Sequence, residues 1–214
     1  KYNGKKGFYK EFEDLAALGI VADAMDIRNL DNNAIIYNGF SNIQNEMFKG
    51  LLEQQKFSIK KPDNPTKLDV MFYIAPLINA TIRSGTDEEK LALFEGFITQ
   101  DSKEIITSIS RGEERNETLY QFLARSAVNL RGRQNTQKQK SLEKIMAQIE
   151  EEGLNENKVL IVKTGAEDVP QNITGLVAMD ISSIYKKPTL ILRPVLEGGN
   201  VYYRGSGRAT PVDG

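Results

Sequence analysis

Apolar residues recur at helical spacing through the first 152 residues of the chain. Between Phe8 and Met25 they surround the helix axis instead of forming one stripe, a pattern typical of a buried helix. Two prolines within the segment 60–65 break the pattern and mark a connector. The remaining helices are predicted over residues 41–55, 75–82, 87–97, 119–129 and 141–152, with Gly153 as a stop.

Beyond Gly153 the pattern changes to short runs rich in β-branched and aromatic residues. These runs predict strands over residues 159–162, 189–192 and 201–203. A helix over 175–185 separates the first two strands, and a hairpin turn is expected at 197–200. The predicted fold class is therefore α/β, with a helical N-terminal and middle part followed by a small mixed β-sheet domain that has a crossover helix.

The composition limits the chemistry that the chain can carry. It has 214 residues, of which 40% are hydrophobic, enough for one good core or two small ones. The absence of Cys and His excludes disulfides, thiolate metal sites and histidine catalysis. No apolar run approaches the roughly 20 residues of a membrane span, so we expect a cytoplasmic protein. Because the sequence starts at Lys1 and stops in a loop-like segment, we also expect a piece of a longer protein.

Charge is unevenly distributed, although the formal net charge is only −1. Between Arg111 and Lys144 there are eight Lys and Arg residues against four Glu, a local net charge of +4. This stretch is either a solvated helix face or a track for a nucleic-acid backbone, in which Arg125, Arg131 and Arg133 would take part. Both interpretations stay open.

A first candidate for chemistry is Asp23, at the end of the apolar stretch Leu18-Gly19-Ile20-Val21-Ala22-Asp23. A carboxylate in apolar surroundings needs a cation or hydrogen-bond donors, whereas the alternative is an exposed helix end shared with Asp26. The stretch from Leu15 to Gly39 resembles the fourth conserved block of the RecJ family of DHH phosphoesterases. In that block Leu-Gly-Thr-Val-Ala-Asp supplies a ligand to a catalytic manganese. The resemblance thus implies Asp23 as a metal ligand and Mn²⁺ or Mg²⁺ as cofactor, although Ile20 replaces the usual Thr and Asn33 the usual Arg.

A second block contains Asn79 and Arg83, four residues apart on a predicted helix, so that an amide and a guanidinium face the same way. At that spacing the pair can bind phosphate or sugar oxygens, or it can cap a turn and pair with a carboxylate. The block Pro76–Arg83 is similar to the RecJ stretch Gly-Pro-Arg-Ile-Asn-Ala-Ala-Gly-Arg. Leu77 and Ile82 depart from it, so we expect a somewhat different groove.

The third block closes the chain with Gly205-Ser206-Gly207-Arg208. Taken alone, this is a flexible turn; with its glycines allowing positive φ, a hydroxyl and a guanidinium could also grip a phosphate. Together with Thr174–Ala178 and Tyr185–Leu192 it resembles the RecJ form of the DHH-associated domain, whose Gly-Ser-Gly-Arg-Ser loop binds substrate. Ala209 replaces the final Ser, and Val169–Asn172 replaces the family's Trp-His-Pro-Gly stretch.

The resemblance also implies an organisation and a function. Residues 1–46 would end the DHH catalytic domain, 47–70 would be a helical connector, and 71–214 would form the DHH-associated domain, with helices over 71–152 and a sheet over 156–214. The parent would degrade single-stranded DNA from the 5′ end in DNA repair and recombination. This portion would be inactive alone, because it has no Asp-x-Asp run, no Asp-His-His triplet and no Gly-His motif. The rest of the parent chain, with the DHH domain, would be its partner.

Two other classes of function stay open. One is a non-catalytic nucleic-acid-binding or assembly module that keeps the fold. The other is a DHH phosphodiesterase for short oligonucleotides or cyclic dinucleotides, which share the Gly-rich loop. The block from Pro76 to Arg83 favours the RecJ interpretation.

Overall fold

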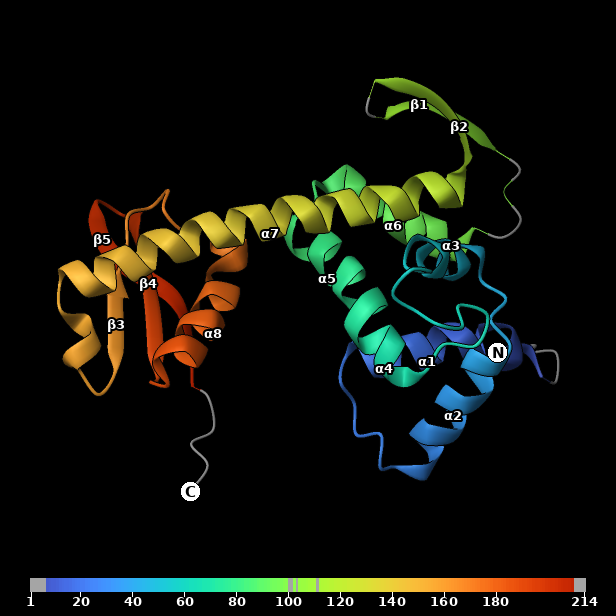
Figure 1. The fold of residues 1–214 in the computed structure, drawn as a ribbon, viewed down its shortest axis with the longest axis horizontal. Helices are drawn as coiled ribbons and strands as arrows, with labels where there is room; N and C mark the ends of the chain where they lie inside the picture. The colour runs from blue at the N-terminus through green and yellow to red at the C-terminus, as the bar shows by residue number, and fades with distance from the viewer. Residues whose placement is uncertain (1–6, 100–101, 103, 111, 210–214) are drawn as a thin grey trace. The chain divides into compact units, whose positions relative to one another are not determined.

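The computed structural model describes residues 7–99, 102, 104–110 and 112–209 (Figure 1). The chain divides into two compact units, Lys1–Arg131 and Gly132–Gly214, and the division falls within the long helix α7 (Leu119–Glu151). Helices dominate the first unit and a small mixed sheet the second, so the predicted α/β class is confirmed. None of the described helices is long and apolar enough to cross a membrane.

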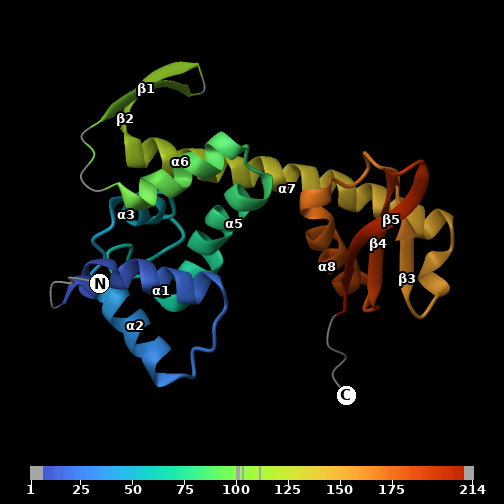
Figure 2. The ribbon, with the colours of Figure 1, turned by 180° about the vertical axis from the view of Figure 1, so that it is seen from behind.

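The first unit is built from helices of moderate length around one core (Figure 2). Buried side chains from well-separated segments, among them Phe40, Met47, Phe48, Ile74 and Leu123, pack together in it. Burial of such side chains contributes about 1.5–3 kcal/mol each before conformational entropy is counted. The helices of the first unit are η1 (Phe8–Phe12), α1 (Glu13–Ala22), α2 (Leu30–Ser41), α3 (Glu46–Gln54), α4 (Lys67–Asp69), η2 (Val70–Ile74), α5 (Ala75–Ser84), α6 (Asp87–Ile98) and the first part of α7.

A buried carboxylate ties α1 to the start of α3. Asp14 is only 2% exposed, and one of its oxygens accepts hydrogen bonds of 2.8 Å from the backbone N–H groups of Gln44 and Asn45. The Asn45 side chain in turn caps α3 by accepting from the N–H of Phe48. Because α1 and α2 also touch where Gly39 leaves no room for a Cβ against the carbonyl of Glu13, the three helices form one packed group.

A two-stranded hairpin, β1 (Ile105–Ser110) and β2 (Glu113–Thr118), precedes α7. Arg125 of α7 donates from Nη2 to Oε2 of Glu117 at 2.6 Å and to the Ser108 hydroxyl at 2.9 Å, and its guanidinium lies over the Phe122 ring. The two charged side chains are only 15% and 13% exposed. This ion pair fastens the hairpin to the helix.

The second unit places helices on one face of a three-stranded sheet. Parallel strands β3 (Leu160–Lys163) and β4 (Thr189–Glu197) are joined through α8 (Thr174–Tyr185), and β5 (Asn200–Arg208) pairs antiparallel with β4. Short turns of 3-10 helix, η3 (Leu154–Glu156) and η4 (Gln171–Ile173), lie in the connections. The core beneath the sheet is formed by Leu142, Ile145, Ile149, Leu160, Val162, Val169, Ile173, Val177, Ala178, Ile181 and Ile191.

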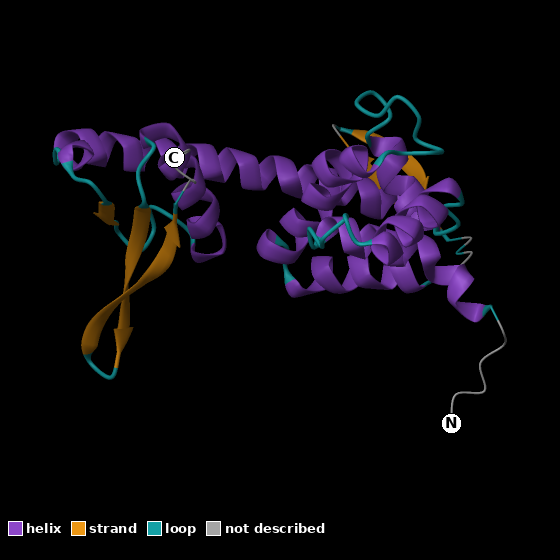
Figure 3. Cartoon of the chain, turned by 90° about the horizontal axis from the view of Figure 1, so that it is seen from below, coloured by secondary structure: helices purple, strands orange, loops and turns teal. Residues whose placement is uncertain are grey.

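Strand β4 extends beyond the end of its parallel partner β3. β3 pairs with β4 only up to Lys163↔Leu192, whereas β4 and β5 continue to a tight turn at Gly198 and Gly199, both with positive φ (Figure 3). The last bond of the parallel ladder runs from the N–H of Thr164 to the carbonyl of Leu192. In this alternating pattern the next β4 donor would be residue 194, which is proline and has no N–H.

Several sequence predictions need correction. The helices predicted over 119–129 and 141–152 are one helix, because the polar residues between them include no proline and Gly132 lies exposed within the helix. Helix α2 and the hairpin β1–β2 are absent from the prediction. The predicted loop Gly205–Arg208 is the end of β5, in register with Thr189–Leu192.

The predicted domain boundaries after residues 46 and 70 both fall inside the first unit. The core of that unit takes residues from before, between and after these two positions. The three-part division, which follows from the family resemblance, stays a prediction.

Candidate nucleic-acid interface

The end of β5 and the start of α8 meet in the second unit. A Cβ added at Gly175, the second residue of α8, would lie 2.8 Å from Nη2 of Arg208 and 3.5 Å from Oγ of Ser206. The guanidinium and the hydroxyl are therefore next to the helix N-terminus, where backbone N–H groups and the helix dipole favour an anion. Two kinds of side-chain donor, a charged fork and a hydroxyl, thus lie together beside the start of α8.

The two glycines of β5 serve different purposes. A Cβ at Gly205 would overlap the carbonyl oxygen of Ile191, so only glycine allows β5 to run this close to β4. A Cβ at Gly207 would meet no heavy atom closer than 3.7 Å. Neither glycine has the positive φ expected from the sequence, because both lie in an extended, paired strand.

Arg208 is exposed and Ser206 partly exposed, so solvent reaches both. Nη1 of Arg208 donates to the carbonyl oxygen of Gly207 at 2.7 Å, which orients the guanidinium while other N–H groups remain able to donate. At the helix end, the hydroxyl of Thr174 donates to the carbonyl of Pro170 instead of capping α8. The arrangement suits a phosphate group bound by charge-assisted hydrogen bonds.

Asn79 and Arg83 lie one turn apart on α5, and both are exposed. Their shared face matches the prediction that an amide and a guanidinium point the same way. α5 continues directly from the π-helical turn η2, with Pro76 in its first turn. That the pair contacts nucleic acid stays a prediction.

Asp23 is exposed at the C-terminal end of α1, not enclosed by apolar side chains. The helix ends in a Schellman motif, in which Met25 N–H bonds to Ile20 carbonyl and Ala24, with φ of 51°, bonds to Val21 carbonyl. The neighbouring Asp26 is paired with Arg28 at 2.9 Å, and hydrogen bonds from Arg28 hold the pKa of Asp26 below its usual value.

The residues present do not by themselves fit a metal centre. Within the described ranges no group of three or more His, Cys, Asp or Glu side chains is placed to hold a metal ion. Asp23 is one oxygen ligand, and hard divalent cations need several. A divalent metal at Asp23 would require ligands from outside the described residues.

The three arginines predicted as a backbone track differ in their surroundings. Arg125 is committed to Glu117 and Ser108, and these hydrogen bonds raise the pKa of Arg125 and lower that of Glu117. Arg131 is partly buried, whereas Arg133 is exposed and interacts with another group of the chain. The track stays a prediction, and the described contacts give Arg125 a structural role.

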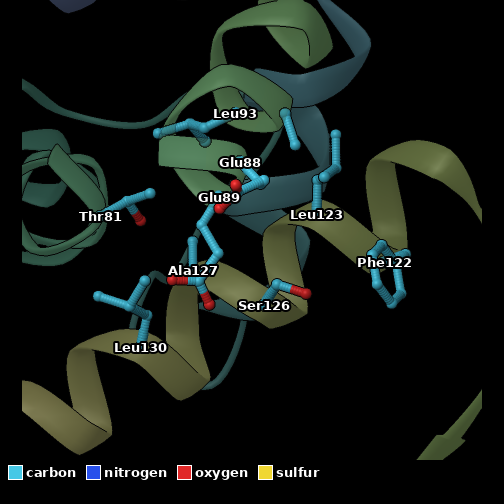
Figure 4. A pocket seen from close by; sticks show the side chains of 10 residues that line it. Thr81, Glu88, Glu89, Leu93, Phe122, Leu123, Ser126, Ala127 and Leu130 are labelled. Atoms are coloured by element: carbon cyan, nitrogen blue, oxygen red, sulfur yellow. The ribbon is translucent and has the colours of Figure 1, made fainter. Parts of the chain in front are cut away.

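A hollow of about 290 Å³ opens in the first unit among α5, α6 and α7 (Figure 4). Glu88 and Glu89 of α6 lie beside it, and a hydrogen bond with Thr86 lowers the pKa of Glu88, which stays charged at neutral pH. The lining residues are Thr81, Glu88, Glu89, Ala92, Leu93, Phe122, Leu123, Ser126, Ala127 and Leu130. Apolar walls and negative charge do not suit phosphate, so this hollow is not a candidate for binding a nucleic-acid backbone.

Two residues of structural weight escaped the sequence predictions. Gly175 was part of a matched block, but its contact with Arg208 depends on how β5 folds back beside α8. Asp14 was not singled out, although it precedes Leu18 by one helical turn on the side that becomes buried. That spacing is the signal that could have found it.

Comparison with known proteins identifies relatives of this chain, although no family model matches it. The chain is 35% identical over 202 residues to an SPbeta prophage-derived protein of Bacillus subtilis, described as the single-strand DNA-specific exonuclease YorK. The corresponding protein of Bacillus phage SPbeta matches equally. Each match covers 93% of this chain and 34% of the relative, so the chain spans about a third of the length of these curated relatives.

Solved structures agree with the sequence matches. RecJ from Thermus thermophilus, in complex with Mn²⁺, aligns with a TM-score of 0.61 and 25% identity, covering 86% of this chain and 24% of that one. A structure of exonuclease RecJ bound to manganese aligns with a TM-score of 0.60 at 24% identity, over 86% of this chain and 40% of that one.

The chain is therefore RecJ-like in sequence and in fold, and the resemblance predicted from its three blocks is confirmed. Its similarity to the YorK proteins of Bacillus subtilis and phage SPbeta extends over about a third of their length.

Proposed function

We propose that this chain is the strand-holding portion of a metal-dependent 5′→3′ exonuclease for single-stranded DNA. The observation that carries the proposal is the meeting of Gly175, Ser206 and Arg208 at the start of α8. The names of the relatives support the choice of substrate, because they describe single-strand DNA-specific exonucleases. The protein would act in the cytoplasm.

Within this proposal each residue has a physical task. The guanidinium of Arg208 forks onto a phosphate of the strand, the Ser206 hydroxyl donates to the same group, and the α8 N-terminus adds a favourable dipole. Gly175 leaves room for the Arg208 guanidinium beside α8, since any side chain at position 175 would push against Arg208. On α5 of the first unit, Asn79 and Arg83 would hold another phosphate or sugar of the strand.

Asp23 would contribute one carboxylate to a site for Mn²⁺ or Mg²⁺ whose other ligands belong to the rest of the parent protein. Such ions supply Lewis acidity and an activated water in phosphodiester hydrolysis. RecJ structures bound to Mn²⁺ and Mg²⁺ support a divalent ion in the intact protein. The exposed position of Asp23 leaves its carboxylate accessible to such an ion.

The phosphate site is tested by titrating a fluorescent 5′-phosphorylated oligothymidylate in an anisotropy assay. We expect Arg208→Ala to weaken binding by roughly 10–100-fold, the equivalent of one or two charge-assisted hydrogen bonds. Arg115→Ala, which removes the same charge from the exposed β2 strand, is the matched control. Unchanged affinity in Arg208→Ala would remove the role proposed for that residue.

The alternative of a non-catalytic binding or assembly module is separated by an activity measurement on the full-length protein. Single-strand nuclease activity that disappears in Asp23→Ala, and survives in Asp31→Ala, would exclude that alternative. An inactive full-length protein that still binds DNA through Arg208 would favour it.

A further inference from the structure

The β4–β5 hairpin extends beyond the proposed phosphate site, and its residues 193–204 form a second exposed surface. Since β3 pairs only with Thr189–Leu192, the hairpin from residue 193 to residue 204 has no third strand among the described residues (Figure 3). Successive side chains of a strand point to opposite faces, so the two faces of the hairpin carry different residues. Both faces are accessible in this part of the unit.

The face that carries the phosphate site continues along the hairpin. Directly opposed residues of an antiparallel pair share a face, so Ser206 lies on the side of its partner Ile191, which is buried against the helices. Arg193 and Arg204 are the next pair on that side, and Val195 and Tyr202 the one after. Arg208, Ser206, Arg204 and Tyr202 thus form one row on alternate residues of β5.

The chemistry of this row is suited to a single strand of nucleic acid. The Arg204 side chain is 65% exposed and the Tyr202 residue 51% exposed. Arg193 is held in place because its Nη2 donates to the carbonyl of Ala166 at 2.7 Å. Proteins that bind single strands combine positive charge along the backbone with aromatic rings on which bases stack.

A carboxylate opposes this charge. Glu197 pairs with Arg204 at 2.8 Å, and its side chain is 46% exposed. Exposed ion pairs of this kind contribute little and are screened by salt. A phosphate can therefore replace Glu197 as the partner of Arg204.

We infer that Arg193, Tyr202 and Arg204 guide single-stranded DNA along the hairpin, away from the phosphate held at Arg208. The inference rests on the proposed function, because it extends the same site. Two observations select DNA as the occupant: the row is continuous with the phosphate site, and its cations complement a polyanion. Successive members of the row are spaced by about 6.8 Å along the strand, so the row spans several nucleotides.

The opposite face of the hairpin provides the contrast. Leu196, Val201 and Tyr203 lie there, at 73%, 61% and 48% exposure, and Lys163 lies over the Tyr203 ring at 5.2 Å. This face is mainly apolar. Tyr202 and Tyr203 are therefore neighbours of the same type and similar exposure on opposite faces of one strand.

The test compares 5′-phosphorylated oligothymidylates of two and eight nucleotides by anisotropy, with the whole chain. The octamer should bind the unmodified protein more tightly than the dinucleotide. Tyr202→Ala and Arg204→Ala should each weaken octamer binding by roughly 5–50-fold while leaving dinucleotide binding unchanged. In Arg204→Ala the slope of log affinity against log salt should decrease by about 0.7, the value for one phosphate contact with a single strand.

Tyr203→Ala is the matched control and should bind the octamer like the unmodified protein. Glu197→Gln should bind it about 2-fold more tightly, because Arg204 loses a competing partner. Thermal melts establish that each variant is folded, as expected for exposed positions. If Tyr203→Ala weakens octamer binding and Tyr202→Ala does not, the strand uses the other face and the inference is wrong.

The two proposals fail in different ways. If Tyr202→Ala and Arg204→Ala bind the octamer normally while Arg208→Ala weakens both oligonucleotides, the hairpin path is wrong and the phosphate site stands. If Arg208→Ala binds the dinucleotide normally, the phosphate site itself is wrong.

Discussion

Two groups of charged side chains, one in each unit, have opposite surroundings. In the first unit Asp14 is buried, and Arg125 and Glu117 are largely enclosed, so these charges join one element to another. In the second unit Arg204 and Arg208 lie exposed on one strand. The residue types are alike, but only the second arrangement leaves charge accessible to a ligand. The burial and the partners of a charged side chain, rather than the local charge density, distinguish a structural ion pair from a binding site.

The largest expected effect is a change that should unfold only the first unit. Asp14→Ala removes the charge-assisted hydrogen bonds that the N–H groups of Gln44 and Asn45 donate to this buried carboxylate, which should cost that unit about 2–5 kcal/mol. Hydrogen exchange, which reports each unit separately, should show faster exchange through α1 and α3 and unchanged protection in β3 and β4. Asp31→Ala, an exposed carboxylate on α2, is the control. Equal loss of protection in both units would show that they unfold together.

A smaller effect is expected from a pair of substitutions in the second unit. Gly205→Ala should destabilise it by about 1–3 kcal/mol, because the new methyl group overlaps the Ile191 carbonyl and forces β5 away from β4. Gly207→Ala should be tolerated, since its nearest neighbour is 3.7 Å away. Thermal unfolding followed by circular dichroism measures both. Equal losses of stability in the two variants would contradict the different roles of these glycines.

The smallest effect concerns the β1–β2 hairpin. Arg125→Ala should lower the local protection of the hairpin by about 1–2 kcal/mol, because Glu117 and Ser108 lose their partner, while DNA binding stays unchanged. Hydrogen exchange of the hairpin amides measures this. Arg115→Ala, in the same hairpin, should have a weaker effect.

The same ion pair predicts a pH dependence. Hydrogen bonds from Arg125 lower the pKa of Glu117 from its ordinary value of 4.5, so the pair stabilises the hairpin above that pH. The stabilisation should be lost as the pH falls through the lowered value. Protection in Arg125→Ala should respond much less to acid. An identical acid response in both proteins would exclude this pair as the cause.

Sequence patterns predicted most strongly periodic elements correctly, and the errors have physical causes. Helix α2 starts with a polar turn that is fixed by a cap, in which the Asn29 side chain accepts from the N–H of Asp31, and only Ile36, Gly39 and Phe40 of this helix are buried. The two predicted helices on either side of residue 135 join because nothing between them breaks a helix strongly enough. Local composition does not reveal either outcome.

The candidate site was predicted in its residues but not in its form. Gly205–Arg208 has the composition of a loop, and pairing with β4 makes it a strand, because tertiary contacts override local preference. The approach of Gly175 to Arg208 arises from residues 33 positions apart in the sequence. Only the order of the matched blocks suggested that these segments work together.

Pro194 has a consequence for the behaviour of this protein in concentrated solution. An exposed strand edge with regular N–H groups can recruit a strand from another molecule and start aggregation. Where β3 ends, β4 presents a proline on that side, so the ladder lacks the donor that an incoming strand would need. The β4 edge of the hairpin can thus extend into solvent, with both faces of the hairpin open to ligands, without offering a neighbouring molecule a continuous row of donors on that side.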